Sequence, residues 1–422
     1  MRDERPARGG APLPLLLLLT LLVGVAIGVV VGHFVGGPGA PDGPAPASAQ
    51  VSAAPSPGAS PSPAAAPVPP PTSPPDRPYP DRAYELLDGM SQREKICQLL
   101  VVYPEDVTGV ERATAAGAAT QEALEQYPVG GFLYQKKNME RREQLQTMIS
   151  NVQSFAKLPL LITCDEEGGR VARLMDTVGV TAVGPMLDFK DEGGGTARAN
   201  ARTIAADMAA LGFNADFAPV ADVWSNPDNT VIGDRAYSDD FQQAAELLPA
   251  AVQGFHDGGV ACCLKHFPGH GDTSADSHYG SVYVRKSLAE LREQELLPFQ
   301  AGIDAGADMV MAGHLIVSDV DSEPAPFSHA LITGLLREEM GFQGVVITDG
   351  LRMQAMTDHY TSAQIAVKAV AAGVDMLLCP DDLDGAVAAL TQAVDGGELT
   401  QDRLDESVLR VLTLKLNRGI VA

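Results

Sequence analysis

Residues 260–272 read VACCLKHFPGHGD, and this stretch decides how the rest of the chain is interpreted. Its first five residues are continuously apolar, as in a strand that is buried on both faces of a parallel sheet. Pro268, Gly269 and Gly271 then interrupt regular structure, so the polar residues are expected on a loop that leaves the strand. Catalytic groups of α/β enzymes gather at that end of the strands.

This loop is rich in ionisable side chains. Residues 265–278 include six of them: Lys265, His266, His270, Asp272, Asp276 and His278. One His in such a place is usually a hydrogen-bonded structural residue. Six ionisable groups on one loop with Gly and Pro favour a functional site instead.

Apolar runs and helix-like segments alternate on both sides of this stretch. Eight runs resemble short buried strands: Ile96–Tyr103, Val129–Tyr134, Leu158–Thr163, Ala215–Val220, Val260–Leu264, Met309–Ala312, Gly344–Thr348 and Val374–Leu378. The helix-like segments between them include Met139–Phe155, Thr196–Leu211, Phe241–Asp257, Ser287–Ala305, Ser328–Met340, Ser362–Ala372 and Gly385–Val394. This alternation predicts an α/β fold, a (β/α)8 barrel in a single catalytic domain, with a doubly wound open sheet as the alternative. No G-x-G-x-x-G motif follows the first run, so nothing favours dinucleotide binding.

Charged and polar residues follow five of the apolar runs. They are Asp165–Arg170 with Arg173, then Asp222 with Asp234 and Arg235, then Lys265 and His266, then His314, and finally Asp349. Single charges at strand ends are often helix caps or surface groups. Five strand ends that carry them together are what the carboxyl-terminal face of a barrel needs to bind a polar substrate.

The first 79 residues have a different composition. Residues 9–32 carry no charge, and residues 15–31 are apolar or Gly except for Thr20, which is close to the ~20 residues that cross a bilayer. We predict a cytoplasmic segment 1–10, a transmembrane signal anchor 11–36, a disordered Pro/Ala/Ser-rich linker 37–79 and a catalytic domain 80–422 outside the cytoplasm. The triplet 47–49, Ala-Ser-Ala, resembles a signal-peptidase site, so secretion after cleavage is the alternative.

The formal net charge is −24, and residues 1–79 contain four Arg and four acidic residues, so the whole excess lies on residues 80–422. Such an acidic surface repels phosphate backbones, which argues against a nucleic-acid partner. The five Cys residues lack C-x-x-C spacing and predict buried free thiols. No ligand set with metal spacing is visible, so we expect neither a metal nor a cofactor.

Three motifs together resemble a known family. KHFPGHG at 265–271 with Asp-Ser-His at 276–278, DEEGGR at 165–170 and TDGLRM at 348–353 are similar to the family 3 glycoside hydrolases. More narrowly, they resemble the bacterial β-N-acetylglucosaminidases, also called β-N-acetylhexosaminidases, of that family. The resemblance covers residues from about 85 to 420 and implies retaining hydrolysis of terminal β-linked N-acetylglucosamine from cell-wall or chitin-type glycans.

The resemblance also implies a role for individual residues. Asp349 matches the nucleophile, although an Asp before a helix is also a common N-cap. His278 matches the general acid/base, with Asp276 beside it in a dyad, and an imidazole with a reference pKa of ~6.5 suits proton transfer in both directions. The residues that match substrate contacts are Asp165, Arg173, Arg235, Lys265 and His266.

Some alternatives stay open at this point. A neutral imidazole repels an anionic acceptor less than a carboxylate does, so phosphate could replace water and make the protein an N-acetylglucosaminide phosphorylase. An inactive membrane-tethered glycan-binding module is the alternative outside enzymes, although it would be expected to lose Asp349 or His278, and both are present. The roles of Glu166, where relatives often have Gln, and of His270 and His314 are left unassigned.

Overall fold

The computed structural model describes residues 78–274, 276 and 280–422, which belong to one compact unit. The predicted segment 1–10, the anchor 11–36 and all but the last two residues of the linker 37–79 lie outside the described residues. Within the described ranges, no helix is both long enough and apolar enough to cross a bilayer.

Eight parallel segments form a closed barrel. One sheet has the order β11 (Leu377–Leu378), β1 (Leu100–Val102), β2 (Gly131–Leu133) and β3 (Leu161–Thr163), and a second has the order β10 (Val345–Thr348), β8 (Met309–Ala312) and β6 (Cys263–Phe267). Segment 215–220 joins β3 to β6, because the Phe217 N–H donates to the Cys164 carbonyl at 3.1 Å and isolated bridges pair Ala215 with Ala261 and Val220 with Lys265. A bridge between Ile347 and Met376 joins β10 to β11 and closes the ring. The predicted barrel is therefore confirmed.

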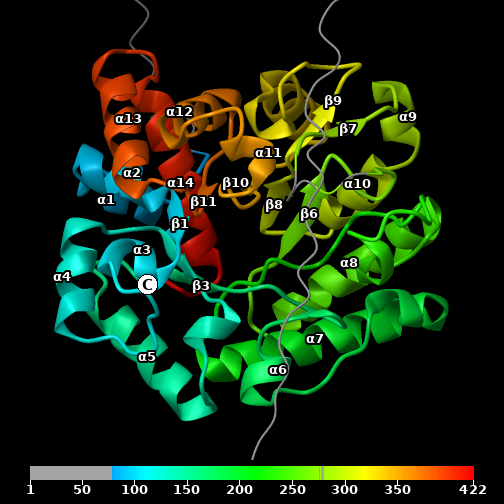
Figure 1. Cartoon of the computed structure of the whole chain (residues 1–422), viewed down its shortest axis with the longest axis horizontal. Helices are drawn as coiled ribbons and strands as arrows, with labels where there is room; N and C mark the ends of the chain where they lie inside the picture. The colour runs from blue at the N-terminus through cyan, green and yellow to red at the C-terminus, as the bar shows by residue number, and fades with distance from the viewer. Residues whose placement is uncertain (1–77, 275, 277–279) are drawn as a thin grey trace, which may run out of the picture. The chain divides into compact units, whose positions relative to one another are not determined.

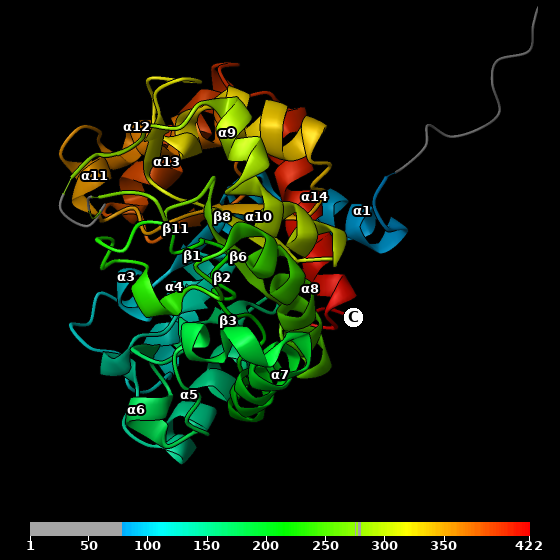
Figure 2. The same cartoon turned by 90° about the vertical axis from the view of Figure 1, so that its right-hand side faces the viewer.

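The helices cover the outside of this barrel (Figures 1 and 2). They are α1 (Asp81–Asp88), α2 (Gln92–Gln98), α3 (Pro104–Thr108), α4 (Ala118–Gln126), α5 (Arg142–Phe155), α6 (Met175–Val178), α7 (Gly194–Leu211), α8 (Phe241–Asp257), α9 (Leu288–Glu293), α10 (Leu296–Asp304), α11 (Gln354–Thr357), α12 (Ser362–Ala372), α13 (Leu383–Asp395) and α14 (Gln401–Asn417). Between them, η5 (Ala330–Glu339) is a π-helix, and η1 (Lys136–Asn138), η2 (Met186–Glu192), η3 (Gly233–Arg235) and η4 (Ala325–Phe327) are 3₁₀ turns. Helices α7, α8 and α10 pack side by side along one side of the barrel, as Figures 1 and 2 show.

Most predicted helices are observed, although the segment predicted at 328–340 is the π-helix η5. The segment predicted as one helix at 287–305 is two helices, α9 and α10, and Pro298 lies in the first turn of α10, where its missing N–H costs nothing. Residues 96–98, predicted to begin the first strand, belong instead to α2, because a capping box between Ser91 and Glu94 starts a helix just before them.

Side chains alternate between two apolar cores. Every second strand residue, such as Val101, Met309, Met311 and Ile347, fills the barrel interior. The residues between them, such as Leu100, Val310 and Val346, pack outward beneath the helices. This period of two places Lys265 on the inner side of β6, two residues beyond the inward-facing Cys263.

The fifth strand differs from its prediction in a way that shapes the cleft. Lys265 and His266 were expected on a loop, but they belong to β6. The pairing of β6 with β8 shifts between Leu264, opposite Val310, and Phe267, opposite Ala312, so three steps on β6 match two on β8. Such a bulge breaks the alternation and re-aims a side chain, which lets both Lys265 and His266 line the same space.

Two short pairs stand outside the barrel. Strands β4 (Glu166–Gly168) and β5 (Val171–Ala172) form an antiparallel hairpin directly after β3. Strands β7 (Val282–Val284) and β9 (Leu315–Val317) form a parallel pair in the segments that follow β6 and β8.

Candidate active site

A cleft of about 480 Å³ lies at the carboxyl ends of the barrel strands. All the predicted substrate contacts and the predicted nucleophile line it: Asp165, Arg173, Arg235, Lys265, His266 and Asp349. They come from positions 165 to 349 in the sequence, and the closed barrel brings them to one face. The barrel therefore collects the predicted residues in a single cleft.

The floor of the cleft carries a buried charge network around Lys265. The Lys265 ammonium lies 2.9 Å from Asp165 Oδ1 and 2.5 Å from Glu167 Oε1. Arg235 donates to both oxygens of Glu167, from Nε at 2.7 Å and from Nη2 at 2.9 Å. Such a paired, two-pronged contact fixes both partners geometrically.

The network keeps Glu167 and Lys265 ionised by shifting their pKa values. Burial alone would raise the pKa of Glu167, but the charges of Arg235 and Lys265 outweigh burial and hold that pKa below its ordinary value. Burial would likewise lower the pKa of Lys265, yet Asp165 and Glu167 raise it above its ordinary value. The floor therefore presents fixed charges to a ligand at neutral pH. Glu167 had no predicted role, although the DEEGGR motif that contains it was the available signal.

Arg173 stands at the side of the cleft, near Asp165. Its Nη2 lies 3.7 Å from Asp165 Oδ2, which is an ion pair rather than a hydrogen bond, and among the described residues its buried Nε has no hydrogen-bond partner. A guanidinium with unused donors in a polar cleft can bind the hydroxyl groups of a ligand.

Asp349 follows β10 and is partly buried at the cleft. Its own N–H donates to the Ala312 carbonyl at 3.0 Å, and its Oδ1 accepts the Gly350 N–H at 2.7 Å. Burial would raise the pKa of Asp349, but the nearby His266 and His314 and the Gly350 N–H lower it below its ordinary value. Asp349 is thus an ionised carboxylate that lines the cleft, with Oδ1 bonded to the Gly350 N–H.

His266 is held by a buried carboxylate that had no predicted role. Its Nδ1 lies 2.6 Å from Oδ2 of Asp222, and its backbone N–H donates to the same oxygen at 3.1 Å. Asp222 is 1% exposed, and its other oxygen accepts the His270 N–H at 2.6 Å. The sequence placed Asp222 at the end of the fourth strand, but spacing alone could not show which ring it contacts.

The three residues left unassigned now have places. Glu166 is buried, and its carboxylate accepts the N–H groups of Leu174 at 2.7 Å and Met175 at 3.1 Å, so it holds the turn that follows Arg173 and is not among the lining residues of the cleft. His270 lines the cleft and is anchored through Nδ1 to Thr273 Oγ1 at 2.6 Å. His314 is buried next to Asp349, whose pKa it helps to lower.

The predicted acid/base dyad is described only in part. Asp276 is among the described residues and is partly buried, whereas His278 lies outside them. The roles predicted for Asp276 and His278 stay predictions, as does a reaction without metal or cofactor.

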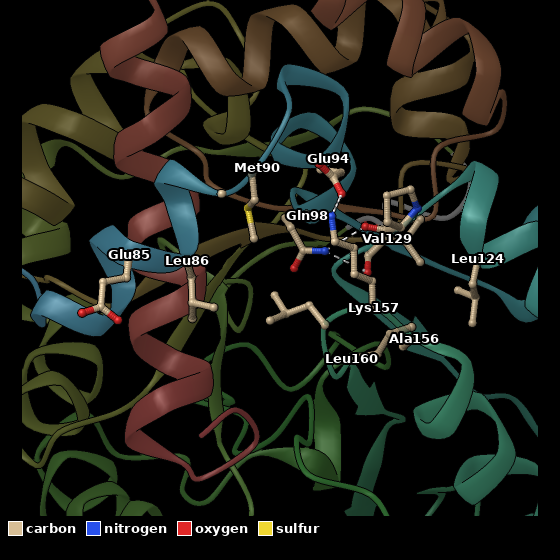
Figure 3. Close-up of a pocket in the computed structure, with 13 residues that line it drawn as sticks. Glu85, Leu86, Met90, Glu94, Gln98, Leu124, Val129, Ala156, Lys157 and Leu160 are labelled. Carbon is tan, nitrogen blue, oxygen red and sulfur yellow. Dashed lines mark hydrogen bonds and ion pairs between the residues drawn. The ribbon is translucent and has the colours of Figure 1, made fainter.

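A second pocket, of about 200 Å³, shares no lining residue with the cleft (Figure 3). Its walls are mainly aliphatic and include Leu86, Leu124, Val129 and Leu160. Its charged groups include Glu94 and Lys157, which form an ion pair with each other. This pocket lacks the carboxylate–imidazole grouping that the cleft carries.

Comparisons with known proteins agree with this geometry. The profile of the glycosyl hydrolase family 3 N-terminal domain matches residues 91–414. A beta-hexosaminidase of Xanthomonas oryzae pv. oryzae is 37% identical over 294 residues, which are 68% of this chain and 86% of that protein. Beta-hexosaminidase A of Pseudoalteromonas piscicida is 33% identical over 324 residues, 70% of this chain, but the chain spans only 54% of that relative.

A solved structure supports the same relationship. The glycoside hydrolase family 3 beta-N-acetylglucosaminidase of a Paenibacillus species superposes with a TM-score of 0.74 at 36% sequence identity, over 78% of this chain and 63% of that one. The profile spans most of the described barrel, including every strand that contributes to the cleft. The chain belongs to glycoside hydrolase family 3.

Proposed function

We propose that this protein is a retaining β-N-acetylglucosaminidase that removes terminal β-linked N-acetylglucosamine from cell-wall or chitin-type glycans. The observation that carries the proposal is the ionised Asp349 in the same cleft as the Asp165–Lys265–Glu167–Arg235 network. A carboxylate beside a set of charged sugar-binding groups is the pairing that this reaction requires. The names of the Xanthomonas and Paenibacillus relatives point to the same activity.

The proposed reaction has two steps. In the first, Oδ2 of Asp349 bonds to the anomeric carbon while the bond to the leaving oxygen breaks, and His278 gives that oxygen its proton. In the second, His278 takes a proton from water, the water oxygen bonds to the anomeric carbon, and Asp349 leaves. Each displacement inverts the anomeric carbon, so the product keeps the β configuration of the substrate.

The network at the floor of the cleft supports binding of the terminal sugar. Asp165 accepts from hydroxyl groups, and the ammonium of Lys265 and the guanidinium of Arg173 donate to them. Because these groups are buried or half-buried, a sugar that lacks one hydroxyl would leave a polar group without a partner. The site would thus discriminate between sugars that differ in a single hydroxyl.

A direct test compares two chromogenic substrates. The full chain is incubated with an aryl N-acetyl-β-glucosaminide and, separately, with the matching aryl β-glucoside, and proton NMR follows the first-formed anomer. We expect preferred cleavage of the N-acetyl compound with the β-anomer appearing first. The α-anomer as first product would contradict the retaining mechanism, and equal cleavage of both substrates would contradict the sugar specificity.

The same assay separates hydrolysis from phosphorolysis. Repeating it with inorganic phosphate should give free N-acetylglucosamine and no sugar 1-phosphate. Accumulation of the 1-phosphate would show that the protein is a phosphorylase. Cleavage of muropeptides compared with chitobiose, followed by mass spectrometry, identifies the natural class of glycan.

The proposed location is the cell membrane, with a single span at residues 11–36 and the catalytic domain on the extracytoplasmic side. The support is the uncharged run 9–32, which follows three Arg residues. Fractionation of cells that carry a carboxyl-terminal tag tests this: we expect the tag in the membrane fraction and sensitive to external protease. Recovery of a shortened protein from the medium would favour the secreted alternative.

A further inference from the structure

Asp222 occupies a place in the fold that ties it to His266. The segment that carries Asp222 runs beside β6, with the Ala221 N–H donating to the Lys265 carbonyl at 2.7 Å and Val220 bridged to Lys265. This pairing holds Asp222 next to the end of β6, where His266 lies at the bulge. The contact between the two residues is therefore set by neighbouring parallel segments rather than by a flexible loop.

The carboxylate of Asp222 receives three donors, and two of them are backbone N–H groups. Oδ2 accepts the His266 N–H at 3.1 Å and faces Nδ1 of the His266 ring at 2.6 Å, while Oδ1 accepts the His270 N–H at 2.6 Å. Burial alone would raise the pKa of Asp222, but His266 and these hydrogen bonds lower it below its ordinary value. The group is therefore an ionised carboxylate, which can only accept hydrogen bonds.

An ionised acceptor fixes the tautomer of the ring that faces it. Nδ1 of His266 must carry a proton to bond with Asp222, which leaves Nε2 as the ring nitrogen for the cleft that His266 lines. His266 in turn helps to lower the pKa of Asp349 and so favours its ionised form. The chain of contacts thus runs from Asp222 through the imidazole to the proposed nucleophile.

We propose that Asp222 is a positioning residue for the reaction: it fixes the His266 ring with the proton on Nδ1 and presents Nε2 to the cleft beside Asp349. The proposal rests on the proposed function, but its structural part, the tautomer of His266, does not. Asp222 is not among the residues that line the cleft, and we place its effect on the reaction in its contact with the His266 ring.

An amide cannot replace this carboxylate. If the side-chain oxygen of the Asp222→Asn variant faced His266, its NH₂ group would point at the His270 N–H; if that oxygen faced His270, the NH₂ group would point at the His266 N–H. Either orientation places two donors against each other in a buried site. Asp222→Asn therefore keeps the size of the side chain but should no longer fix the tautomer and orientation of the His266 ring.

The decisive experiment is a double-mutant cycle on kcat/KM for the aryl N-acetyl-β-glucosaminide. We expect Asp222→Asn to lower kcat/KM by about 100-fold in the wild-type background. In a His266→Gln background, where the ring is already absent, the same substitution should cost at most about 3-fold. An equal factor in both backgrounds would overturn the proposal, because Asp222 would then act independently of His266.

A matched control separates positioning from general stability. Asp308 also faces an imidazole, that of His256 at 3.0 Å, and neither residue lines the cleft. Asp308→Asn should lower the melting temperature while kcat/KM stays within about 2-fold of wild type. Loss of activity from Asp308→Asn as large as that from Asp222→Asn would contradict a specific role for Asp222.

A measurement on the unaltered protein covers the case in which Asp222→Asn does not fold. In ¹⁵N-histidine-labelled protein, the two-bond nitrogen–proton correlations report which ring nitrogen is protonated, and the His266→Gln spectrum identifies the His266 signals. We expect a protonated Nδ1 at pH 7, whereas a ring protonated on Nε2 alone would overturn the proposal. If the protein does not cleave the glycoside at all, the proposed function fails while the tautomer can still be read.

Discussion

Two Asp–His pairs stand near opposite ends of β6, and their surroundings differ. Near the carboxyl end, Asp222 binds Nδ1 of His266 and two backbone N–H groups, which leaves Nε2 of the ring to the cleft. Near the amino end, Asp308 contacts Nε2 of His256 at 3.0 Å, accepts the Cys262 N–H at 3.0 Å and accepts from Nε of Arg418 at 2.6 Å.

The third partner decides what each pair can do. At the amino end, Nη2 of Arg418 also lies 2.6 Å from Nε2 of His256. The guanidinium therefore contacts both Asp308 and the imidazole, and Nε2 of His256 is occupied by these contacts. The ligand atoms of His256, Cys262 and Asp308 lie within 4.8 Å of one another, and the positive charge of Arg418 at two of them disfavours a cation there. The same pair of residue types thus stabilises the fold at one end and serves the proposed chemistry at the other.

The largest expected effect is the loss of activity caused by a substitution in the cleft, at the carboxyl end of the barrel. Asp349→Asn preserves the size of the side chain but removes the nucleophile, so kcat for the aryl N-acetyl-β-glucosaminide should fall by about 10⁴-fold. Stopped assays with purified protein measure the loss, and calorimetric binding of N-acetylglucosamine serves as the control for an intact cleft. A variant that keeps a tenth of the wild-type rate would rule out Asp349 as the nucleophile.

Lys265→Met should destabilise the protein as well as inactivate it. Removal of the ammonium leaves Asp165 and the buried Glu167 with one cation fewer, so the free energy of unfolding should fall by about 3–5 kcal/mol. Urea denaturation followed by circular dichroism measures this change. Lys190→Met is the matched control, because the Lys190–Asp239 pair is exposed to solvent and its loss should leave the melting temperature unchanged. Equal effects of the two substitutions on stability would show that burial of the Lys265 network does not increase its contribution to the free energy of unfolding.

Lys415, a buried residue of α14, gives a pH-dependent contrast to Lys265. Its ammonium has Gln98 Oε1 as an acceptor at 2.9 Å, and burial lowers its pKa from 10.5 to about 7. The unfolded chain therefore binds more protons between pH 7 and pH 10.5, so this residue makes the protein more stable as the pH rises through that window. Below pH 7, Lys415 is protonated in both the folded and the unfolded protein, so its contribution to the free energy of unfolding does not change with pH.

Lys415→Met removes this dependence. The stability advantage of Lys415→Met over wild type should shrink by about 2 kcal/mol between about pH 7 and about pH 9. Urea denaturation of both proteins at the two pH values measures the difference. A constant advantage across the window would show that Lys415 keeps an ordinary pKa in the folded protein.

Asp308→Asn should have a modest effect that is confined to stability. The substitution weakens the contacts to His256 and Arg418, so the free energy of unfolding should fall by about 1–3 kcal/mol. Thermal melts measure the loss, and the glycoside assay shows whether activity stays near that of wild type. Arg418→Lys keeps the charge but not the forked donors, and it should lower the melting temperature by a smaller amount. If Asp308→Asn lost more activity than Asp222→Asn, the contrast between the two Asp–His pairs would be wrong. A larger stability loss from Asp222→Asn than from Asp308→Asn would not contradict that contrast.

The sequence predicted the order of the barrel elements because apolar runs and helical periods alternate regularly along the chain. Helices α8 and α12 begin and end where the sequence placed them, and β8 does as well. The sequence also placed Asp165, Lys265 and Asp349 at strand ends and Arg235 in the loop after the fourth strand, and the closed barrel gathers these residues in one cleft. The motifs that resemble family 3 lie in these same segments, so the family was accessible from the residues alone.

Other features depended on contacts between segments that are far apart in the sequence. Alternation along a strand predicts that neighbouring residues face opposite sides, yet the bulge in β6 lets Lys265 and His266 share the cleft. Glu167 and Asp222 gained their roles from Arg235, 68 residues away, and from His266, 44 residues away. The sequence by itself determined which residues reach the carboxyl end of the barrel, because local apolar and helical periods fix the strands. Only the tertiary structure decided which of them are charged, paired or turned toward a ligand, because burial, register and neighbouring strands set those properties.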